Sequence, residues 1–260
     1  MAKRQKKAGA KSSGPKTILG IDIGGTGIKG APVDIERGVL AKPRFRIDTP
    51  QPATPQAVAG TVAAIAKHFK WKGPIGCTFP AVIKDGVAHS AANVDKSWIG
   101  TNGRELIQQA TGCPTELVND ADAAGIAEVM FGAGKGVPGT VLLLTLGTGI
   151  GSALFLDGKL VPNTELGHVI FKGLDAEKYC AESTREREKL GWKKWGKRVN
   201  RYLCHVEFLI APDLLIIGGG VSKKSDKYFK FFNTKCHVVP AKMLNEAGII
   251  GGAAVAKHLL

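Results

Sequence analysis

The stretch Asp22-Ile23-Gly24-Gly25-Thr26-Gly27-Ile28-Lys29-Gly30 joins two apolar segments, and Leu146-Gly147-Thr148-Gly149-Ile150-Gly151 joins two more further along the chain. Glycine lacks a Cβ atom, so backbone amides in such a turn can approach an anion closely and form a concave nest for it. Each turn also carries a threonine hydroxyl, and the first adds a lysine ammonium group. We therefore expect phosphate contacts from Gly24, Gly25, Thr26, Gly27, Lys29, Thr148 and Gly149.

The segment directly after each glycine turn separates two kinds of phosphate site. The second turn resembles a fragment of the GxGxxG dinucleotide fingerprint, but that fingerprint needs a helix directly after its glycines. Here both turns lead into residues with strand character, 28–33 and 152–156. Each is therefore predicted to be a glycine hairpin. A plain tight hairpin would explain either motif alone, whereas two such turns with an internal threonine favour phosphate binding.

The apolar segments follow one plan twice: a hairpin with a glycine turn, and then helices and strands. The first cycle has predicted strands at 17–23, 28–33, 39–47, 75–82 and 116–118, with helices at 57–69, 104–110 and 119–130. The second has strands at 140–146, 152–156, 214–217 and 236–239, a helical region at 176–209 interrupted near Gly191 and Gly196, and helices at 225–232 and 252–260. We predict two α/β lobes, 17–131 and 132–251, after a disordered basic tail at 1–16.

A pair of polar residues, Asn119-Asp120, lies between a predicted strand and the helix that follows it. Phosphoryl transfer to an alcohol needs a base that accepts the hydroxyl proton, together with electrostatic clamping of the phosphates. A carboxylate where a strand ends and a helix begins is well placed for this work in α/β proteins. Asp120 is the candidate base. Its alternative role is that of an ordinary helix cap.

Polar residues of a second group suit the hydroxyls of a sugar. Glu165-Leu166-Gly167-His168 and the later Glu177 supply two carboxylates and an imidazole, and Asn93 is a loop amide that could also contact a sugar. His168 could instead be structural, or it could ligate a metal. No Cys or His partner lies at a useful spacing for metal binding.

Basic residues exceed acidic ones, with a formal net charge of +14. Besides the tail, the excess lies in two stretches, 185–201 and 223–235. Such stretches attract polyanions, namely nucleic acid, a membrane surface or a phosphate-rich substrate, although a solvated helix face explains either stretch alone. The five cysteines are scattered and unpaired by spacing, which favours reduced thiols in the cytoplasm. We expect no signal peptide and no membrane span.

Taken in this order, these motifs resemble the ROK family of sugar kinases and repressors, from residue 18 to the C-terminus. The resemblance implies an actin-like ATPase (ribonuclease H-like) fold, with a central cleft between two lobes and the helix at 252–260 packed back on the first lobe. It makes Asn119-Asp120 the catalytic motif and places 215–221, with Gly219 and Gly220, near the nucleotide. It implies that Asp22 orients a hydrated Mg²⁺ ion. The implied sugar ligands are Asn93, Asn119, Asp120, Glu165, His168 and Glu177.

Two departures from the family pattern narrow the resemblance. Residues 169–182 contain a single cysteine, Cys180, so the Cys-rich zinc motif of many members is not expected. The short N-terminal tail is too small for the DNA-binding domain of the repressors. The loss of zinc together with a basic helix resembles the polyphosphate glucokinases and glucomannokinases. In that branch a polyphosphate groove would involve Lys193, Lys194, Lys197, Arg198 and Arg201.

The resulting expectation is a cytoplasmic kinase, monomeric or homodimeric, that phosphorylates the 6-hydroxyl of glucose or mannose from ATP or polyphosphate. Neither a membrane nor a specific nucleic acid is expected as a partner. The alternative is a sugar-responsive, nucleic-acid-binding regulator built on a kinase-like body, which the net charge and the basic tail support. An actin-like ATPase acting on protein partners would leave Glu165, His168 and Glu177 without a role.

Overall fold

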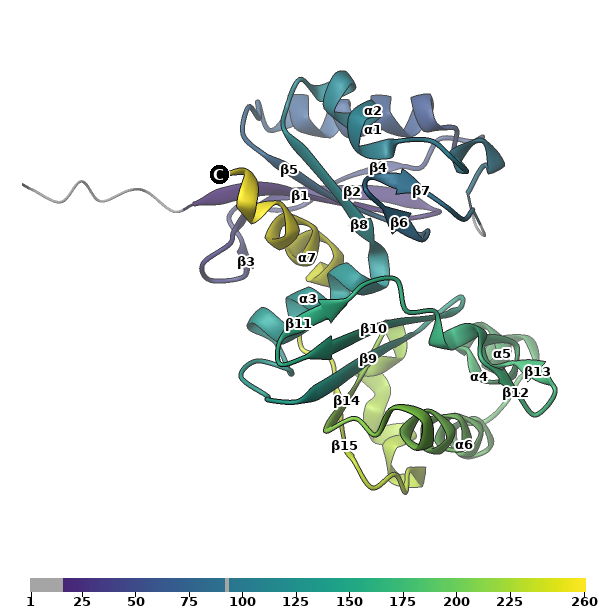
Figure 1. The fold of residues 1–260 in the computed structure, drawn as a ribbon. Helices are drawn as coiled ribbons and strands as arrows, with labels where there is room; N and C mark the ends of the chain where they lie inside the picture. Colours follow the sequence, from purple (N-terminus) through teal and green to yellow (C-terminus); the bar gives the residue numbers. More distant parts are fainter. Residues whose placement is uncertain (1–15, 92–93) are drawn as a thin grey trace, which may run out of the picture.

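The computed structural model describes residues 16–91 and 94–260, which form two α/β lobes, each built around one sheet (Figure 1). Asn93 and residues 1–15 of the basic tail lie outside this part of the chain. No helix in the described ranges is long and apolar enough to cross a membrane.

The sheet of the first lobe begins with the predicted glycine hairpin. Its strands are β1 (Thr17–Ile23), β2 (Gly27–Asp34), β3 (Val39–Leu40), β4 (Phe45–Asp48), β5 (Ile75–Phe79) and β8 (Thr115–Asn119). β2 runs antiparallel to β1, and Ile23 lies opposite Ile28 across the glycine turn. On the other side of β1, β5 and β8 continue the sheet in parallel. The carboxyl ends of these parallel strands therefore meet at one edge, which is where α/β proteins bind ligands.

The sheet of the second lobe repeats this arrangement. Its strands are β9 (Thr140–Leu146), β10 (Ile150–Leu156), β11 (Lys159–Val161), β14 (Leu214–Gly218) and β15 (His237–Pro240). β10 returns antiparallel to β9, while β14 and β15 add in parallel on the other side. Both glycine turns thus continue into strand, as predicted, and the two halves share one plan.

The helices differ from the sequence prediction at three points. They are α1 (Pro55–His68), α2 (Gly103–Thr111), α3 (Asp120–Phe131), α4 (Ala176–Cys180), α5 (Glu182–Arg187), α6 (Trp192–Ile210) and α7 (Ala247–Val255). Gly196 lies inside α6 instead of breaking it. A glycine occurs there because a larger side chain would press against Tyr228 and Phe231. The helix expected at 225–232 consists of two 3₁₀ segments, η3 (Gly220–Lys227) and η4 (Phe229–Phe231). The helix expected from residue 252 begins at Ala247.

The two lobes meet through a pair of helices, α3 and α7, that lie side by side between the sheets (Figure 1). α7 covers the inner face of the first sheet, and α3 covers that of the second. Small residues allow this packing: a Cβ atom on Gly76 would overlap the carbonyl oxygen of Gly252, and one on Gly251 would overlap that of Ala123. Backbone-to-backbone contact therefore explains why glycines occur inside α7, where they cost helix propensity.

Candidate active site

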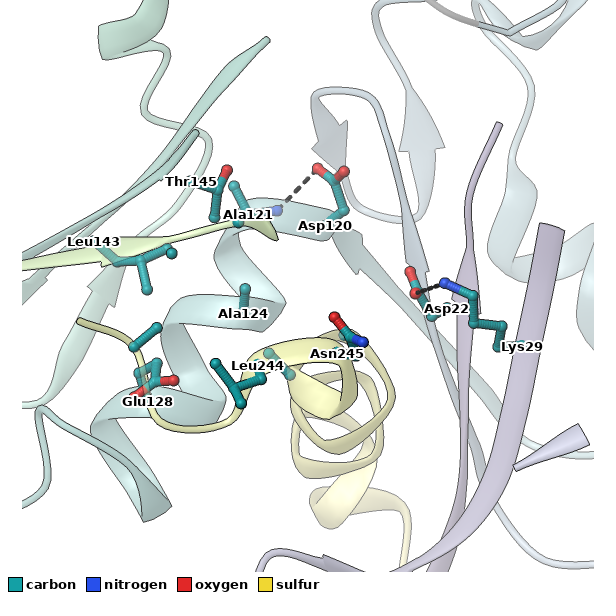
Figure 2. Close-up of a pocket in the computed structure, with 15 residues that line it drawn as sticks. Asp22, Lys29, Asp120, Ala121, Ala124, Glu128, Leu143, Thr145, Leu244 and Asn245 are labelled. Carbon is teal, nitrogen blue, oxygen red and sulfur yellow. Dashed lines mark hydrogen bonds and ion pairs between the residues drawn. The ribbon is translucent and has the colours of Figure 1, made fainter. Parts of the chain in front are cut away.

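A cavity of about 240 Å³ lies between the lobes where strand ends and helix starts converge (Figure 2). It is lined from the first lobe by Asp22 and Lys29, and from α3 by Asp120. Thr145 and Gly219 contribute from the second lobe. Asn245 of η5 (Leu244–Glu246) and Gly248 at the start of α7 complete the wall, so both lobes and the interlobe helices form one site.

The turn that presents Asp120 is held by Asn119. The Asn119 side-chain oxygen accepts hydrogen bonds from the backbone N–H groups of Ala121 (2.8 Å) and Asp122 (3.0 Å), and its amide nitrogen donates to the Ala81 carbonyl (3.0 Å). Asn119 is therefore the N-cap of α3, and Asp120 is the first residue of the helix. This arrangement excludes the capping role for Asp120. It also gives the buried Asn119 amide a structural task, and its contact with a sugar stays a prediction.

The environment of Asp120 suits a base that works near neutral pH. Its carboxylate is exposed to the cleft, and the surrounding walls of the two lobes desolvate it enough to raise its pKa to about 6. A backbone N–H bond from Ala121 opposes this rise, whereas the nearby carboxylates of Asp22 and Glu165 add to it. Asp120 is thus ionised at neutral pH while remaining able to take up a proton, as general bases require.

Asp22, the residue expected to orient a hydrated Mg²⁺ ion, lies on β1 beside the same cavity (Figure 2). Its Oδ1 accepts a hydrogen bond from the Thr78 hydroxyl (3.1 Å), and its Oδ2 is 3.7 Å from Nζ of Lys29, its cross-strand partner. Within the described residues no group of three potential metal-ligating side chains occurs. A single carboxylate fits Mg²⁺, which keeps most of its water ligands and often binds through one or two carboxylates.

The first glycine turn has a second cation that the sequence analysis missed. Arg46 on β4 donates to the Thr26 carbonyl (2.9 Å) and pairs with Asp48 (2.6 Å), and its guanidinium group lies where a Cβ on Gly27 would stand. In the sheet Arg46 lies opposite Lys29. The meander predicted over 28–47 could have indicated Arg46, since a meander places the strands that carry Lys29 and Arg46 in one sheet.

The second glycine turn is held by residues of α4 and α5. Glu177 accepts a hydrogen bond from the Ile150 backbone N–H (2.9 Å), and its carboxylate occupies the space that a Cβ on Gly149 would need. The Ser183 hydroxyl donates to the Thr148 carbonyl (2.6 Å), and its N–H donates to that of Gly147 (3.1 Å). Glu177, which was predicted to contact a sugar, thus holds the second glycine turn in place.

The remaining sugar candidates form a cluster beside that turn, in and around η2 (Leu166–His168). Nδ1 of His168 is 2.8 Å from Oδ2 of Asp175, and its Nε2 is 4.0 Å from Oε2 of Glu165. The hydrogen bond to Asp175 is the main cause of the raised pKa of His168, and partial burial raises the pKa of Glu165. Asp175 also caps α4 through the Glu177 N–H (2.9 Å). Sequence reasoning missed Asp175, although an aspartate just before a helix is a common cap.

A third backbone turn, at Gly219, forms part of the cavity wall on the side of the second lobe. Gly219 has a φ of 80°, and a Cβ there would overlap the backbone of Leu146 at the end of β9. Glycine is required for both reasons, since other residues rarely adopt such a φ. Gly219 lines the cavity, and Gly220 begins η3 immediately beyond it.

The basic residues of α6 lie outside the cavity lining. Lys193, Lys194 and Lys197 are exposed. Arg198 pairs with Glu188 (2.7 Å) and donates to the Tyr179 carbonyl (3.2 Å), and Arg201 donates to the Tyr179 hydroxyl (3.3 Å). The two arginines expected in a polyphosphate groove are therefore engaged by protein groups.

Comparisons with known proteins identify relatives in sequence and in structure. The chain is 51% identical to polyphosphate glucokinase of Mycobacterium tuberculosis over 236 residues, which is 90% of this chain and 89% of that protein. It matches the crystal structure of an inorganic polyphosphate/ATP-glucomannokinase from Arthrobacter sp. strain KM with a TM-score of 0.88 and 51% identity, over 92% of this chain and 98% of that one.

A more distant match extends the likeness in fold. The structure of a ROK family glucokinase from Streptomyces griseus, solved with glucose and AMPPNP, has a TM-score of 0.79 at 23% identity, covering 94% of this chain and all of that one (100%). The two-lobed actin-like fold predicted from the motifs is thereby confirmed. The ROK family model itself matches residues 18–184, and the chain accordingly belongs to the ROK family.

Proposed function

We propose that this protein is a glucokinase that transfers a phosphoryl group from polyphosphate or ATP to the 6-hydroxyl of glucose. The observation that carries the proposal is the Asp120 carboxylate, which Asn119 releases from capping and which lines one cavity together with Lys29 of the first lobe and Gly219 of the second. The relatives at 51% identity, named for polyphosphate and glucose or mannose, support the choice of substrates.

In the proposed reaction Asp120 accepts the proton of the glucose 6-hydroxyl while the oxygen forms a bond to the terminal phosphorus. The bond between that phosphorus and the bridging oxygen breaks, and ADP or a shortened polyphosphate leaves with the bonding electron pair. The raised pKa of Asp120, about 6, brings it closer to neutral pH, where a general base works best.

The charge on the transferred phosphoryl group is balanced by groups from both lobes. Backbone amides of the turns at 24–27 and 147–149 would bind its oxygens, and Lys29 supplies a positive charge next to Asp22. A Mg²⁺ ion oriented by Asp22 through water would neutralise charge between the last two phosphates when bound. No zinc is part of the proposed site.

The sugar would lie between Asp120 and the cluster of Glu165, His168 and Glu177. The Asp175 carboxylate holds the His168 ring by its Nδ1, which directs Nε2 away from Asp175 and towards the side where Glu165 lies. Closure of the lobes, which we propose to be 17–131 with 252–260 and 132–251, would exclude water and limit hydrolysis of the donor. A cytoplasmic location is supported by the five free thiols.

A coupled assay that crosses ATP and polyphosphate with glucose, mannose and fructose tests the proposal. We expect turnover of glucose with both donors, and the same matrix decides whether mannose is used. The Asp120→Asn variant serves as the control, since it should retain glucose binding in calorimetry. Absence of glucose phosphorylation with either donor in the wild-type protein would refute the proposed function.

A further inference from the structure

Three cations from two different elements converge on one tryptophan ring outside the cavity. The guanidinium carbon of Arg185, on α5, is 4.4 Å from the ring centroid of Trp192, and the Nζ atoms of Lys224 and Lys227, on η3, are each 5.7 Å from it. We call these four residues the Trp192 cluster. The Tyr228 ring stacks on that of Trp192, with centroids 5.9 Å apart, and so holds the ring in place.

The positive charges of the Trp192 cluster are only partly balanced by the protein around it, because the Glu182 carboxylate is shared between Arg185 and Lys224. An aromatic face attracts each cation within about 6 Å, but the three positive charges repel one another. The carboxylates that form ion pairs here, Glu182 and Glu186, both pair with Arg185, at 3.7 and 3.4 Å. Among the described residues no ion pair involves Lys224 or Lys227, and both are exposed. Such an arrangement gains stability when an anion binds.

The two segments that carry these cations, α5 and η3, begin next to the second glycine turn and next to Gly219, respectively. Ser183, two residues before Arg185, donates to the carbonyls of Gly147 and Thr148. η3 begins directly after Gly219, which lines the cavity, and Lys224 follows within it. Glu182 brings α5 and η3 into contact, because its carboxylate is 3.5 Å from the position of a Cβ on Gly220. The cluster therefore adjoins the donor side of the cavity.

We propose that the Trp192 cluster binds the part of a linear polyphosphate that extends beyond its reacting end. This inference rests on the proposed function and specifies where its polymeric donor lies. It replaces the groove expected on α6, whose two arginines are engaged by Glu188 and Tyr179. The three phosphates of ATP can be held at the glycine turns, so only the longer donor depends on the cluster.

The test is the double variant Lys224→Ala/Lys227→Ala, assayed with ATP and with polyphosphate of several hundred units. We expect the KM for polyphosphate to rise on the order of tenfold, with the KM values for ATP and glucose and the ATP-dependent kcat unchanged. Each lost lysine–phosphate contact should also lower the slope of log affinity against log salt by roughly 0.7 to 0.9. Normal ATP kinetics in the same preparation show that the variant is folded.

The matched control is Lys67→Ala/Lys72→Ala, which removes two exposed charges from the outer side of the first lobe. An equal rise in this control, or an equal loss with ATP in the cluster variant, would overturn the inference. It would also fall if Lys193→Ala/Lys194→Ala on α6 raised the KM for polyphosphate while the cluster variant did not. If the wild-type protein uses ATP but no polyphosphate, the polyphosphate part of the proposed function fails together with the inference. If polyphosphate use is normal in the cluster variant, only the inference fails.

Discussion

Replacing Asp120 by asparagine tests whether its carboxylate is the base. Asparagine keeps the size of the side chain, and Asn119 continues to cap α3, so the turn should survive. An amide has no basic oxygen of comparable strength. We expect kcat to fall about a hundredfold to ten-thousandfold, the range typical of general-base contributions, with glucose affinity within a few-fold of normal.

The pH dependence of the wild-type enzyme supplies the second part of this test. With a pKa of about 6, Asp120 is roughly nine-tenths ionised at pH 7 and about one-tenth ionised at pH 5. If the ionised form is the base, kcat should fall about tenfold between these pH values, and the residual activity of Asp120→Asn should lack this step. Steady-state kinetics in buffers of constant ionic strength measure both.

The Asp120→Asn substitution, which should lower activity, should raise the stability of the protein at neutral pH. The folded-state pKa of this acid is raised, so its ionised form destabilises the fold above about pH 6, and the penalty disappears below the unfolded value of about 4. Asp120→Asn should therefore unfold at a higher temperature than the wild-type protein at pH 7, and at a similar temperature at pH 4. Near-normal turnover in the variant, or a wild-type kcat that is flat from pH 5 to 7, would remove Asp120 from the proposed chemistry.

Four further substitutions, one of them a control, test other parts of the structure. Gly76→Ala should lower the free energy of unfolding by about 1 to 3 kcal/mol in denaturant, because the added methyl group meets the α7 backbone. The control Gly60→Ala, in the open interior of α1, should instead raise the free energy of unfolding by up to about 1 kcal/mol. Equal effects of the two substitutions would contradict this packing. Asp175→Asn keeps a cap for α4 but removes the anion that raises the pKa of His168, so that pKa should fall in NMR titration and the KM for glucose should rise; an unshifted titration would rule out the pairing. Asn163→Gly removes two side-chain hydrogen bonds (2.9 and 2.8 Å) to the β6 backbone (Ile83–Lys84) of the other lobe and should cost about 1 to 3 kcal/mol, and unchanged stability would show that this link contributes nothing.

The parts of the fold that sequence could predict are those in which local pattern and tertiary structure agree. Both glycine hairpins continue into strand because apolar residues resume directly after each turn. The helix predicted from Gly252 begins earlier, at Ala247, because close backbone packing places Gly251 and Gly252 inside α7. Gly196 misled for the same reason. A glycine needed for helix packing and a glycine that ends a helix look alike until the neighbouring segment is known.

The candidate site shows a similar division. The motifs indicated Asp120, but its release from capping depends on both ends of the Asn119 amide, one of which binds Ala81, far away in the sequence. Arg46 and Asp175 escaped notice because their roles depend on a strand register and on a contact with a histidine. Chemistry carried by one short motif is visible in sequence, whereas chemistry assembled from several segments requires their spatial arrangement.

The position of α7 has a consequence for how the protein is made. This helix covers the inner face of a sheet built from residues near the start of the chain, yet it follows every strand of both sheets in the sequence. During translation the first lobe emerges early, but its inner face stays uncovered until α7 has left the ribosome. Since Gly248 and the neighbouring Asn245 also line the cavity, a nascent chain lacking them has an unfinished cavity. Synthesis itself would thus delay activity until the two lobes can be joined.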